Sequence, residues 1–294
     1  MDLGLDFDDD YFESRESNQQ NSKKSYNAKF CHEQWYNTVE PEPENAAVVI
    51  KFRGDSLYHQ KDYCEALVQY KDAIDTLPVS NKVLKHNLME CVARCYLHME
   101  KYAEALDMAQ QLVRDAKSPQ QQMQTRLLLS QIHEKAQDFI GLEETLKFLL
   151  TMHPFTYSFW IKLGNCYSNQ AGDITLTNLE ELRMKELTCL IRARLLLKNI
   201  LRNAGSGFKS KLIESLRNVE DNLQKLEVSE KLIERSIKYL KDDIYQADDD
   251  EDDDADGTGD TVGKVEQEKE VPLKDDTRSF EQKWFLWIET NDVT

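Results

Sequence analysis

The chain has 294 residues and a formal net charge of -17 at pH 7. Residues 1–16 and 242–260 carry net charges of -6 and -11, so the rest of the chain is close to neutral. A neutral body lacks the basic face that nucleic acid or an anionic membrane attracts, which excludes broad electrostatic binding to either.

The first 46 residues divide into an acidic tail and an aromatic segment. Residues 1–25 show no sustained period and are predicted to be disordered. The large apolar residues of this tail alternate with acids. They are Leu3, Leu5, Phe7, Tyr11 and Phe12. The acids either only keep the tail soluble, or they form with the apolar residues a motif that docks on a partner. Residues 26–46 contain YNAKFCHEQWY, too aromatic for a linker, and we expect this segment to cap the first repeat behind a stiff hinge at Pro41 and Pro43.

Residues 47–203 contain four copies of one helical pattern. In the first copy, residues 47–78, a small residue at Gly54 lets the second helix approach through Ala66, while Tyr63 and Tyr70 fill the wedge between the two helices. Proline has no N–H to donate and ends the unit. The marker residues of this copy are Gly54, Tyr63, Ala66, Tyr70, Ala73 and Pro78. Their order resembles the tetratricopeptide (TPR) repeat of about 34 residues.

The later copies repeat these markers with variations. Ala93 and Tyr102 follow Gly54 and Tyr63 at one offset of 39 residues, and the same copy holds Tyr96 and Ala105. The third copy, near residues 123–154, is more degenerate and starts after Ser118 and Pro119. The fourth matches the TPR pattern W-x2-L-G-x2-Y through Trp160, Leu163, Gly164 and Tyr167. Because one hairpin cannot bury its apolar face alone, we predict an all-α, TPR-like helical-repeat solenoid with disordered acidic N- and C-terminal segments.

After Tyr167 the pattern departs from the TPR repeat. Residues 168–173 are predicted to lengthen the turn, and a long helix is predicted from about residue 178 to residue 203, where AGSG stops it. Residues 204–245 keep a period near 3.6 residues. We interpret them as capping helices for the last repeat rather than an independent dimerising coiled coil, because a solenoid needs a polar-backed cap.

The C-terminal part combines an acidic linker with an aromatic helix. Residues 246–278 contain ADDDEDDDAD, whose like charges repel, so they are predicted to be extended and disordered. Residues 279–290 place five large apolar side chains at helical spacing: Phe280, Trp284, Phe285, Trp287 and Ile288. Such a group is not expected to remain in water. It either caps this chain permanently, docks on it as a regulator, or docks on a partner.

Three stretches resemble a known family: YNAKFCHEQWY, HPFTYSFWIKLGNCY and FEQKWF. They are similar to an uncharacterised vertebrate family of TPR-like proteins whose human member is encoded on chromosome eight. The resemblance spans most of the chain, including KFRGDSLYHQKDYCEALVQY and IRARLLL, but this chain is shorter between Tyr167 and Leu187. It implies a helical-repeat fold and no particular function, since that family has no settled biochemistry.

We expect no enzyme activity, cofactor or metal, because no phosphate-binding loop, HExxH or nucleophile elbow occurs. The cysteines lack framework spacing and the acidic N-terminus is unlike a signal peptide, which indicates a reduced intracellular chain. Cys91 and Cys95 are interpreted as buried structural thiols. A TPR carboxylate clamp, which grips the C-terminal acid of a chaperone, is not expected because only Lys51 matches it. The other four clamp positions hold Asp55, Cys91, Gln124 and Leu128.

These features favour a non-catalytic intracellular adaptor or scaffold, cytoplasmic and/or nuclear, whose TPR-like groove binds a peptide or helix of a protein partner. We expect no direct nucleic acid binding and no membrane association. One alternative is an acidic-tail binder of histones or other basic nuclear proteins. Another is a self-regulated adaptor whose C-terminal aromatic helix docks in its own groove.

Overall fold

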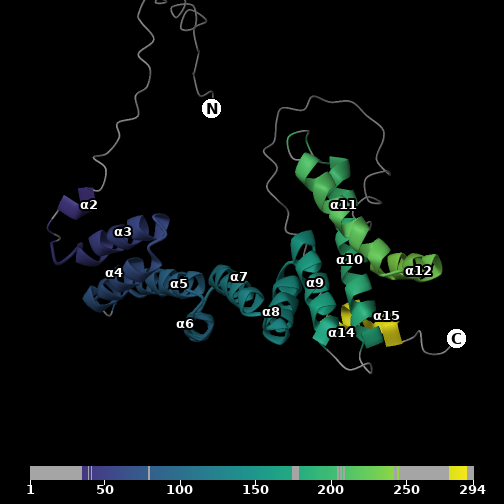
Figure 1. Cartoon of the computed structure of the whole chain (residues 1–294), viewed down its shortest axis with the longest axis horizontal. Coiled ribbons are helices and arrows are strands. Elements are labelled where there is room, and N and C mark those ends of the chain that lie inside the picture. The colour runs from purple at the N-terminus through teal and green to yellow at the C-terminus, as the bar shows by residue number, and fades with distance from the viewer. Residues whose placement is uncertain are drawn as a thin grey trace, which may run out of the picture.

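A computed structural model shows a chain built from helices (Figure 1). It describes residues 35–38, 40, 42–78, 80–173, 179–203, 205, 207, 209–241, 244 and 278–289. Every helix or strand assigned among these residues is an α-helix, which confirms the all-α prediction. The predicted acidic tail, most of the aromatic segment, and residues 246–277 of the acidic linker lie outside the described residues. None of the described helices combines the length and hydropathy that a membrane span needs.

Eight consecutive helices form four hairpins over the four predicted copies. The pairs are α3 (Ala46–His59) with α4 (Tyr63–Thr76), α5 (Lys82–His98) with α6 (Tyr102–Asp115), α7 (Pro119–Ala136) with α8 (Phe139–Met152), and α9 (Tyr157–Asp173) with α10 (Leu179–Asn203). Each helix packs on the next, and α3 to α8 follow one another in a row (Figure 1). The short helix α2 (Trp35–Thr38) packs on α3 at one end of this row.

Side-chain caps set several of the helix starts. Asp62, Asn81 and Asp138 each accept a hydrogen bond from a backbone N–H in the first turn of α4, α5 and α8. Ser118 forms a capping box with Gln121 and precedes the proline that begins α7. These contacts satisfy backbone N–H groups that have no partner within the helix. The hairpin boundaries are therefore encoded locally.

The first hairpin shows what the small and aromatic markers do. A Cβ atom at Gly54 of α3 would lie 2.7 Å from the ring of Tyr70 on α4, so the two helices approach closely at this point. Ala66 is fully buried beside it. The ring of Tyr63 lies edge-on to Tyr58 of α3 at 5.3 Å, and it also stacks on His98 of α5 with a centroid distance of 4.5 Å. Tyr70 and Tyr63 thus both contact α3 within the hairpin, and Tyr63 in addition joins the first hairpin to the second.

The other repeat markers divide into buried and partly exposed positions. The buried ones are Ala73, Ala93, Ala105, Trp160, Leu163, Gly164 and Tyr167. Tyr96 and Tyr102 are half-buried, and Pro78 is exposed just after α4 ends at Thr76. Most of the pattern therefore lies in contacts between helices.

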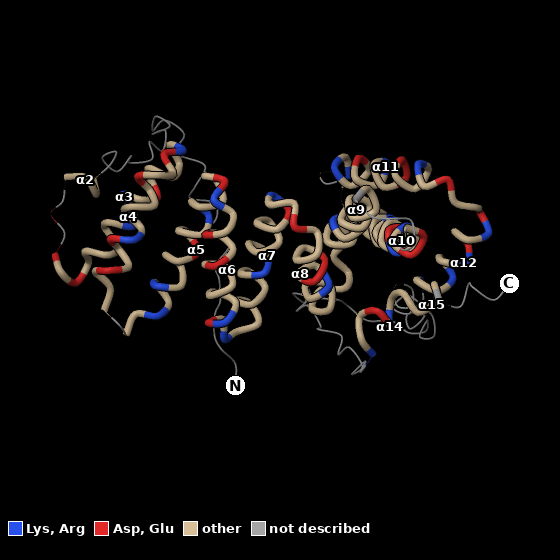
Figure 2. Tube along the Cα trace, turned by 60° about the horizontal axis from the view of Figure 1, so that its bottom comes forward, with Lys and Arg blue, Asp and Glu red and all other residues tan. Residues whose placement is uncertain are grey.

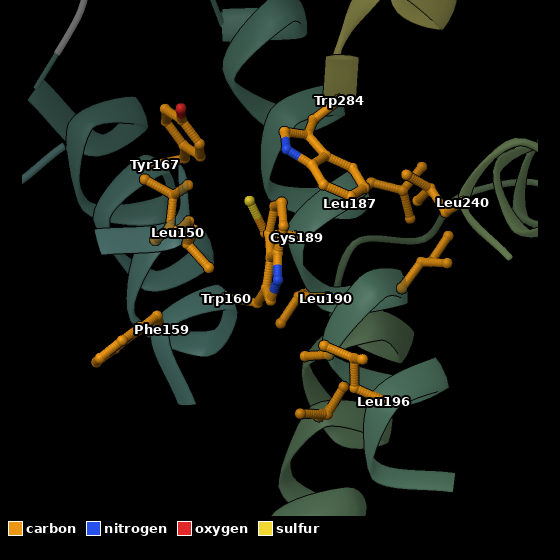
Figure 3. Close-up of a cluster of buried hydrophobic side chains, with 14 of the residues drawn as sticks. Leu150, Phe159, Trp160, Tyr167, Leu187, Cys189, Leu190, Leu196, Leu240 and Trp284 are labelled. Atoms are coloured by element: carbon orange, nitrogen blue, oxygen red, sulfur yellow. The ribbon is translucent and has the colours of Figure 1, made fainter. Parts of the chain in front are cut away.

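The described apolar side chains form three cores. The first is shared mainly by α3, α4 and α5, and the second mainly by α5, α6 and α7. The third extends from α8 to the C-terminal helices, and Figure 3 shows part of it. Each hairpin thus buries its apolar side against its neighbour, as stacked helical units do.

The long helix α10 carries the end of the molecule opposite α2. It begins at Leu179 and ends at Asn203, close to the predicted bounds. Two further helices, α11 (Lys209–Lys225) and α12 (Glu230–Leu240), pack on it (Figure 1). The fully buried Arg192 of α10 donates a hydrogen bond from Nη1 to the carbonyl oxygen of Leu240 at 2.6 Å, which ties α12 to α10.

The prediction that residues 168–173 lengthen a turn is wrong. They form the last part of α9. Gln170 accounts for the difference, because its Nε2 donates to the carbonyl oxygen of Phe139 at 3.1 Å and to Oε2 of Glu143 at 2.9 Å. These contacts with α8 hold α9 helical through a stretch whose serine, asparagine and glycine residues favour a turn.

Candidate functional site

The first helices of the hairpins, α3, α5, α7 and α9, present a continuous surface that we call the first-helix face. Three contacts connect these helices. Tyr58 of α3 lies edge-on to His98 of α5 at 5.5 Å, α5 and α7 line one pocket, and Lys162 of α9 forms a 2.7 Å ion pair with Glu134 of α7. The face consists of Lys51, Asp55, Asn87, Glu90, Arg94, Gln124, Gln131, Glu134, Lys162 and Asn165.

The charges on the first-helix face are paired with one another. Lys51 Nζ lies 2.6 Å from Asp55 Oδ2, and Arg94 donates two hydrogen bonds to Glu90 Oε1 at 2.7 and 3.0 Å. Together with the ion pair between α7 and α9, they leave no large field of one sign. Figure 2 shows basic and acidic residues interspersed along the hairpins. Such a surface suits a partner of mixed polarity better than a polyanion.

A pocket of ≈ 380 Å³ opens between α5, α6 and α7. Leu97 and Tyr102 give it apolar surface, and the other lining residues are polar or charged: Arg94, His98, Glu100, Gln131, Glu134 and Lys135. Such a lining suits a bound side chain that combines an apolar body with a polar group. The pocket joins the first-helix face at three residues that belong to both, Arg94, Gln131 and Glu134.

The five carboxylate-clamp positions are arranged differently from a clamp. Lys51 is engaged by Asp55, whose Oδ1 also accepts a hydrogen bond from the Tyr70 hydroxyl at 2.9 Å. Leu128 is fully buried and Gln124 is exposed. The single cation of the set is therefore already neutralised by a neighbouring acid.

Cys95 and Cys166 are buried core side chains, whereas Cys91, which was predicted to be buried, is half-buried. Burial raises the pKa of Cys91, and it raises the pKa of Cys95 and Cys166 to about 12. A thiol with a raised pKa stays protonated and unreactive near neutral pH. Within the described ranges, no three or more His, Cys, Asp and Glu side chains are placed to hold a metal ion.

The C-terminal segment, residues 278–289, packs on its own chain at a second site. It forms two short helices, α14 (Phe280–Trp284) and α15 (Leu286–Glu289), where the spacing predicted a single helix. Ser279 begins α14 with a capping box that includes Gln282. In Figure 1 both helices are yellow and lie beside α10.

Aromatic rings hold this segment between α8 and α10, over α9. Phe280 stacks on Trp160 with a centroid distance of 5.9 Å, and Trp284 lies edge-on to the same indole at 5.1 Å. Phe285 lies edge-on to Tyr167 at 6.0 Å. Figure 3 shows Trp284 directed into the cluster that contains Trp160. We call this surface of α8, α9 and α10 the α8–α10 seam.

Charged groups reinforce the seam. Lys147 of α8 donates a hydrogen bond to Glu281, and Nζ of Lys185 on α10 lies 3.8 Å from the same carboxylate. Burial alone would lower the pKa of Lys147, but Glu143 and Glu281 raise it above its ordinary value. Burial alone would raise the pKa of Glu143, but hydrogen bonds from Lys147 and Gln170 hold it below its ordinary value. Both Lys147 and Glu143 therefore remain charged at neutral pH.

The buried Arg192 and helix α12 complete the contact. The Arg192 guanidinium lies 4.7 Å from the centroid of the Trp284 ring, a cation–π distance. The hydroxyl of Tyr239 on α12 donates to the carbonyl oxygen of Lys283 at 3.2 Å. The sequence pattern identified the docking segment but not the residues of α8, α9, α10 and α12 that it contacts. The one sequence feature that pointed to this site is Arg192, a charged residue that interrupts an apolar run of α10.

The seam and the first-helix face lie on different sides of α9. At 100° per residue, Lys162 and Asn165 are about 140–200° around the helix from Trp160, whereas Tyr167 lies on the same side as Trp160. The described contacts of the C-terminal segment involve α8, α9, α10 and α12. The segment therefore docks on its own chain, but in the seam and not on the first-helix face.

Comparison with known proteins identifies a family and relatives whose descriptions name no activity. A model for a family described as "Family of unknown function (DUF5588)" matches residues 2–179. The "Uncharacterized protein C8orf76 homolog" of Rattus norvegicus is 32% identical over 178 residues, which cover 58% of this chain and 46% of that protein. The "Uncharacterized protein C8orf76" of Homo sapiens is 30% identical over 169 residues, 57% of this chain and 44% of that protein. The matched region is less than half of each relative, and the family match ends at the first residue of α10.

Proposed function

The chain belongs to the family of unknown function DUF5588, whose description assigns no activity. From the surfaces described above, we propose that it is a non-catalytic, TPR-like adaptor or scaffold. Its first-helix face binds a peptide or helix of a partner protein. The main support for this proposal is the row of hairpins, which leaves one side of α3, α5, α7 and α9 open to solvent.

Two features support the TPR-like part of this proposal. The residues of the W-x2-L-G-x2-Y pattern, Trp160, Leu163, Gly164 and Tyr167, are all buried in α9. At Gly164 a Cβ atom would lie 3.4 Å from the Cβ of Cys189, so α9 and α10 approach to van der Waals contact there. A small residue at this point and large ones on either side are what the TPR pattern requires.

The chemistry of the first-helix face defines the partner we expect. Its cations already have acidic neighbours, so a free C-terminal carboxylate finds no open clamp. A peptide with one large side chain for the pocket at Arg94 and Gln131, and polar groups for the paired charges, fits better. Binding should weaken only modestly as salt rises, because the interface carries little net charge.

The test uses affinity capture from cell extract with the full chain, followed by two double variants measured against the captured partner. Gln124→Arg with Gln131→Arg adds bulk and charge to exposed positions of the first-helix face. Gln110→Arg with Gln111→Arg makes the same chemical change at exposed positions of α6. We expect the first pair to weaken binding at least ten-fold and the second to leave it unchanged.

The two variants separate the proposed surface from a general charge effect. Both must keep the helix content and melting temperature of the original chain, which exposed Gln→Arg changes normally allow. Equal affinity of both variants for the partner would contradict the proposal and move the interface elsewhere. A partner bound through the acidic run at residues 248–256 would instead be lost at high salt from both variants alike.

A further inference from the structure

The α8–α10 seam contacts the C-terminal segment at four positions of a short pattern. Phe280 and Trp284 meet Trp160, Glu281 meets Lys147 and Lys185, and Phe285 meets Tyr167. Between them Gln282 is exposed, and Lys283 accepts from Tyr239 through its main-chain oxygen. The seam therefore recognises an aromatic residue, an acid, two unspecified residues and two aromatic residues in succession.

The same pattern occurs a second time in the chain. Residues 280–285 read FEQKWF, and residues 7–12 read FDDDYF, with aromatic residues and acid at identical spacing. The helix start is also matched, because Asp6 stands where Ser279 caps α14, and both residue types are strong N-caps. Acids at positions 8–10 would favour the first turn of such a helix. Residues 7–12 lie outside the described residues but inside the family match, whereas residues 280–285 lie beyond it.

We propose that residues 7–12 are a second ligand of the α8–α10 seam and compete there with the C-terminal segment. Phe7 takes the place of Phe280 on Trp160, and Asp8 takes the place of Glu281 between the two lysines. Tyr11 takes the place of Trp284 over Arg192, and Phe12 takes the place of Phe285 against Tyr167. This site is separate from the first-helix face, so the proposal does not depend on the adaptor function.

The differences between the two ligands set their order of binding. Tyrosine covers less area than tryptophan over the Arg192 guanidinium, and aspartate is one methylene shorter than glutamate. The buried Trp287 has no aromatic counterpart, since residue 14 is serine. The C-terminal segment therefore occupies the seam first, and residues 7–12 bind when that segment is released.

We expect residues 7–12 to come from a second copy of the chain. They are joined to α2 by the 22 residues 13–34, and α2 lies at the far end of the hairpin row from the seam (Figure 1). A flexible linker of that length has a root-mean-square span of about 26 Å. Neighbouring helices pack about 8–10 Å apart, and the path from α2 through α3, α5 and α7 to α9 takes four such steps, roughly 32–40 Å. Binding within one chain is therefore less favourable than binding between copies.

The test measures fluorescence anisotropy of a labelled peptide of residues 4–14, GLDFDDDYFES, with the full chain. Glu281→Lys places a third cation beside Lys147 and Lys185 and should release the C-terminal segment. Glu214→Lys makes the same change of charge at an exposed position of α11 and serves as the control. We expect the peptide to bind the Glu281→Lys chain at least ten-fold tighter than the original or control chain, and Phe7→Ala with Phe12→Ala in the peptide to abolish this binding.

Equal binding to all three chains, or binding that survives loss of both phenylalanines, would overturn the proposal. In sedimentation, the Glu281→Lys chain should associate with rising concentration, and Phe7→Ala with Phe12→Ala in that chain should remove the association. A Glu281→Lys chain that binds the peptide yet stays monomeric over the same concentrations would refute the second-copy part.

A chimera decides the question if the Glu281→Lys chain fails to fold. Ser279→Asp, Glu281→Asp, Gln282→Asp, Lys283→Asp and Trp284→Tyr make residues 279–285 read DFDDDYF in the full chain. The control carries the same seven residues with the two phenylalanines moved out of register. We expect hydrogen exchange of α9 to stay slow in the chimera and to become fast in the control. Equally fast exchange in both chains would show that the seam does not accept the N-terminal pattern.

Discussion

At the scale of single residues, Gly54 and Gly172 differ in what an added methyl group would meet. A Cβ at Gly54 would lie 2.7 Å from the buried ring of Tyr70, whereas a Cβ at Gly172 would meet no atom within 4 Å. We therefore expect Gly54→Ala to lower the free energy of unfolding by about 1–3 kcal/mol through overpacking. Gly172→Ala should raise it by about 0.4–1 kcal/mol, because alanine loses less backbone entropy on folding.

Urea unfolding of the two variants and the original chain measures both effects. The opposite signs provide the control, since the two changes are chemically identical and both lie in helices. A Gly54→Ala chain as stable as the original would mean that Tyr70 does not pack on this glycine.

The Glu143 carboxylate should stabilise the fold above acidic pH. Its pKa lies below the ordinary value of 4.5, because hydrogen bonds from Lys147 and Gln170 outweigh the cost of burial. A depressed pKa means that the stabilisation is present above pH 4.5 and is lost as the pH falls through the lower, folded-state pKa. Glu143→Gln should therefore reduce stability at pH 7, by about 1–3 kcal/mol for lost charged hydrogen bonds, and the difference should shrink below pH 4.5. A pH-independent difference would argue against this role.

Glu186 should have the opposite effect on stability. Burial raises its pKa, although a hydrogen bond from Ser168 and the charge of Arg183 act against the rise. Its stabilising contribution is therefore greatest at low pH and is lost as the pH rises through the raised folded-state pKa. Glu186→Gln should increase the melting temperature at pH 7, and the gain should shrink as the pH is lowered toward 4.5. Thermal melts of both glutamine variants from pH 3 to pH 8 compare the two signs, and a loss of stability in Glu186→Gln at pH 7 would contradict this prediction.

At the scale of elements, the C-terminal segment behaves as one docking unit. Trp284 and Phe285 are only 5% and 4% exposed, and removal of such a side chain from a core costs about 3–5 kcal/mol. The chain between Lys241 and Arg278 is 36 residues long, so the segment can leave the seam while the remaining helices stay folded. The measured loss cannot exceed the docking free energy of the segment.

We therefore expect the effects of Trp284→Ala and Phe285→Ala to be far from additive. Either variant should release the segment, and the double variant should lose little more stability than each single one. Leu286, which is 44% exposed in the same segment, is the control, and Leu286→Ala should change stability by less than about 0.5 kcal/mol. Urea unfolding of the four variants measures this, and losses that add fully would show that the two rings are held independently.

At the scale of the whole molecule, the three separate cores predict that a mutation destabilises the helices around its own core more than the helices around the other cores. The core of α3, α4 and α5 shares no described residue with the core that contains α9 to α12. In stacked helical units, a change propagates mainly to the nearest neighbours. Trp284→Ala should therefore accelerate hydrogen exchange in α9, α10 and α12 and leave α3 and α4 unchanged.

Gly54→Ala provides the reciprocal experiment. It should accelerate hydrogen exchange in α3, α4 and α5 and leave the exchange rates of α11 and α12 unchanged. Hydrogen exchange measured by mass spectrometry resolves these helices separately. If exchange rates changed equally in all helices of either variant, the chain would unfold as one cooperative unit and not as a series of separately stable hairpins.

The helices could be predicted because their signals are local. Ser118 and Pro119 start α7 through a cap that involves only Gln121, and residues 204–207 follow the end of α10 at Asn203. The recurrence of small and aromatic markers at a 39-residue offset placed the first two hairpins. The prediction failed at residues 168–173, where the turn-forming residues lost to long-range hydrogen bonds from Gln170.

The amino-acid order alone therefore determined the all-helical class, the hairpin positions and the existence of an apolar C-terminal segment, because helix period, caps and breakers act over a few residues. It could not determine where that segment docks. The hydrogen bond between Lys147 and Glu281 spans 134 residues, and it forms only after α8, α9 and α10 have stacked and left Trp160 and Tyr167 uncovered by other helices. Contacts of that kind depend on which surfaces remain after local elements have packed, so the α8–α10 seam is a property of the folded chain.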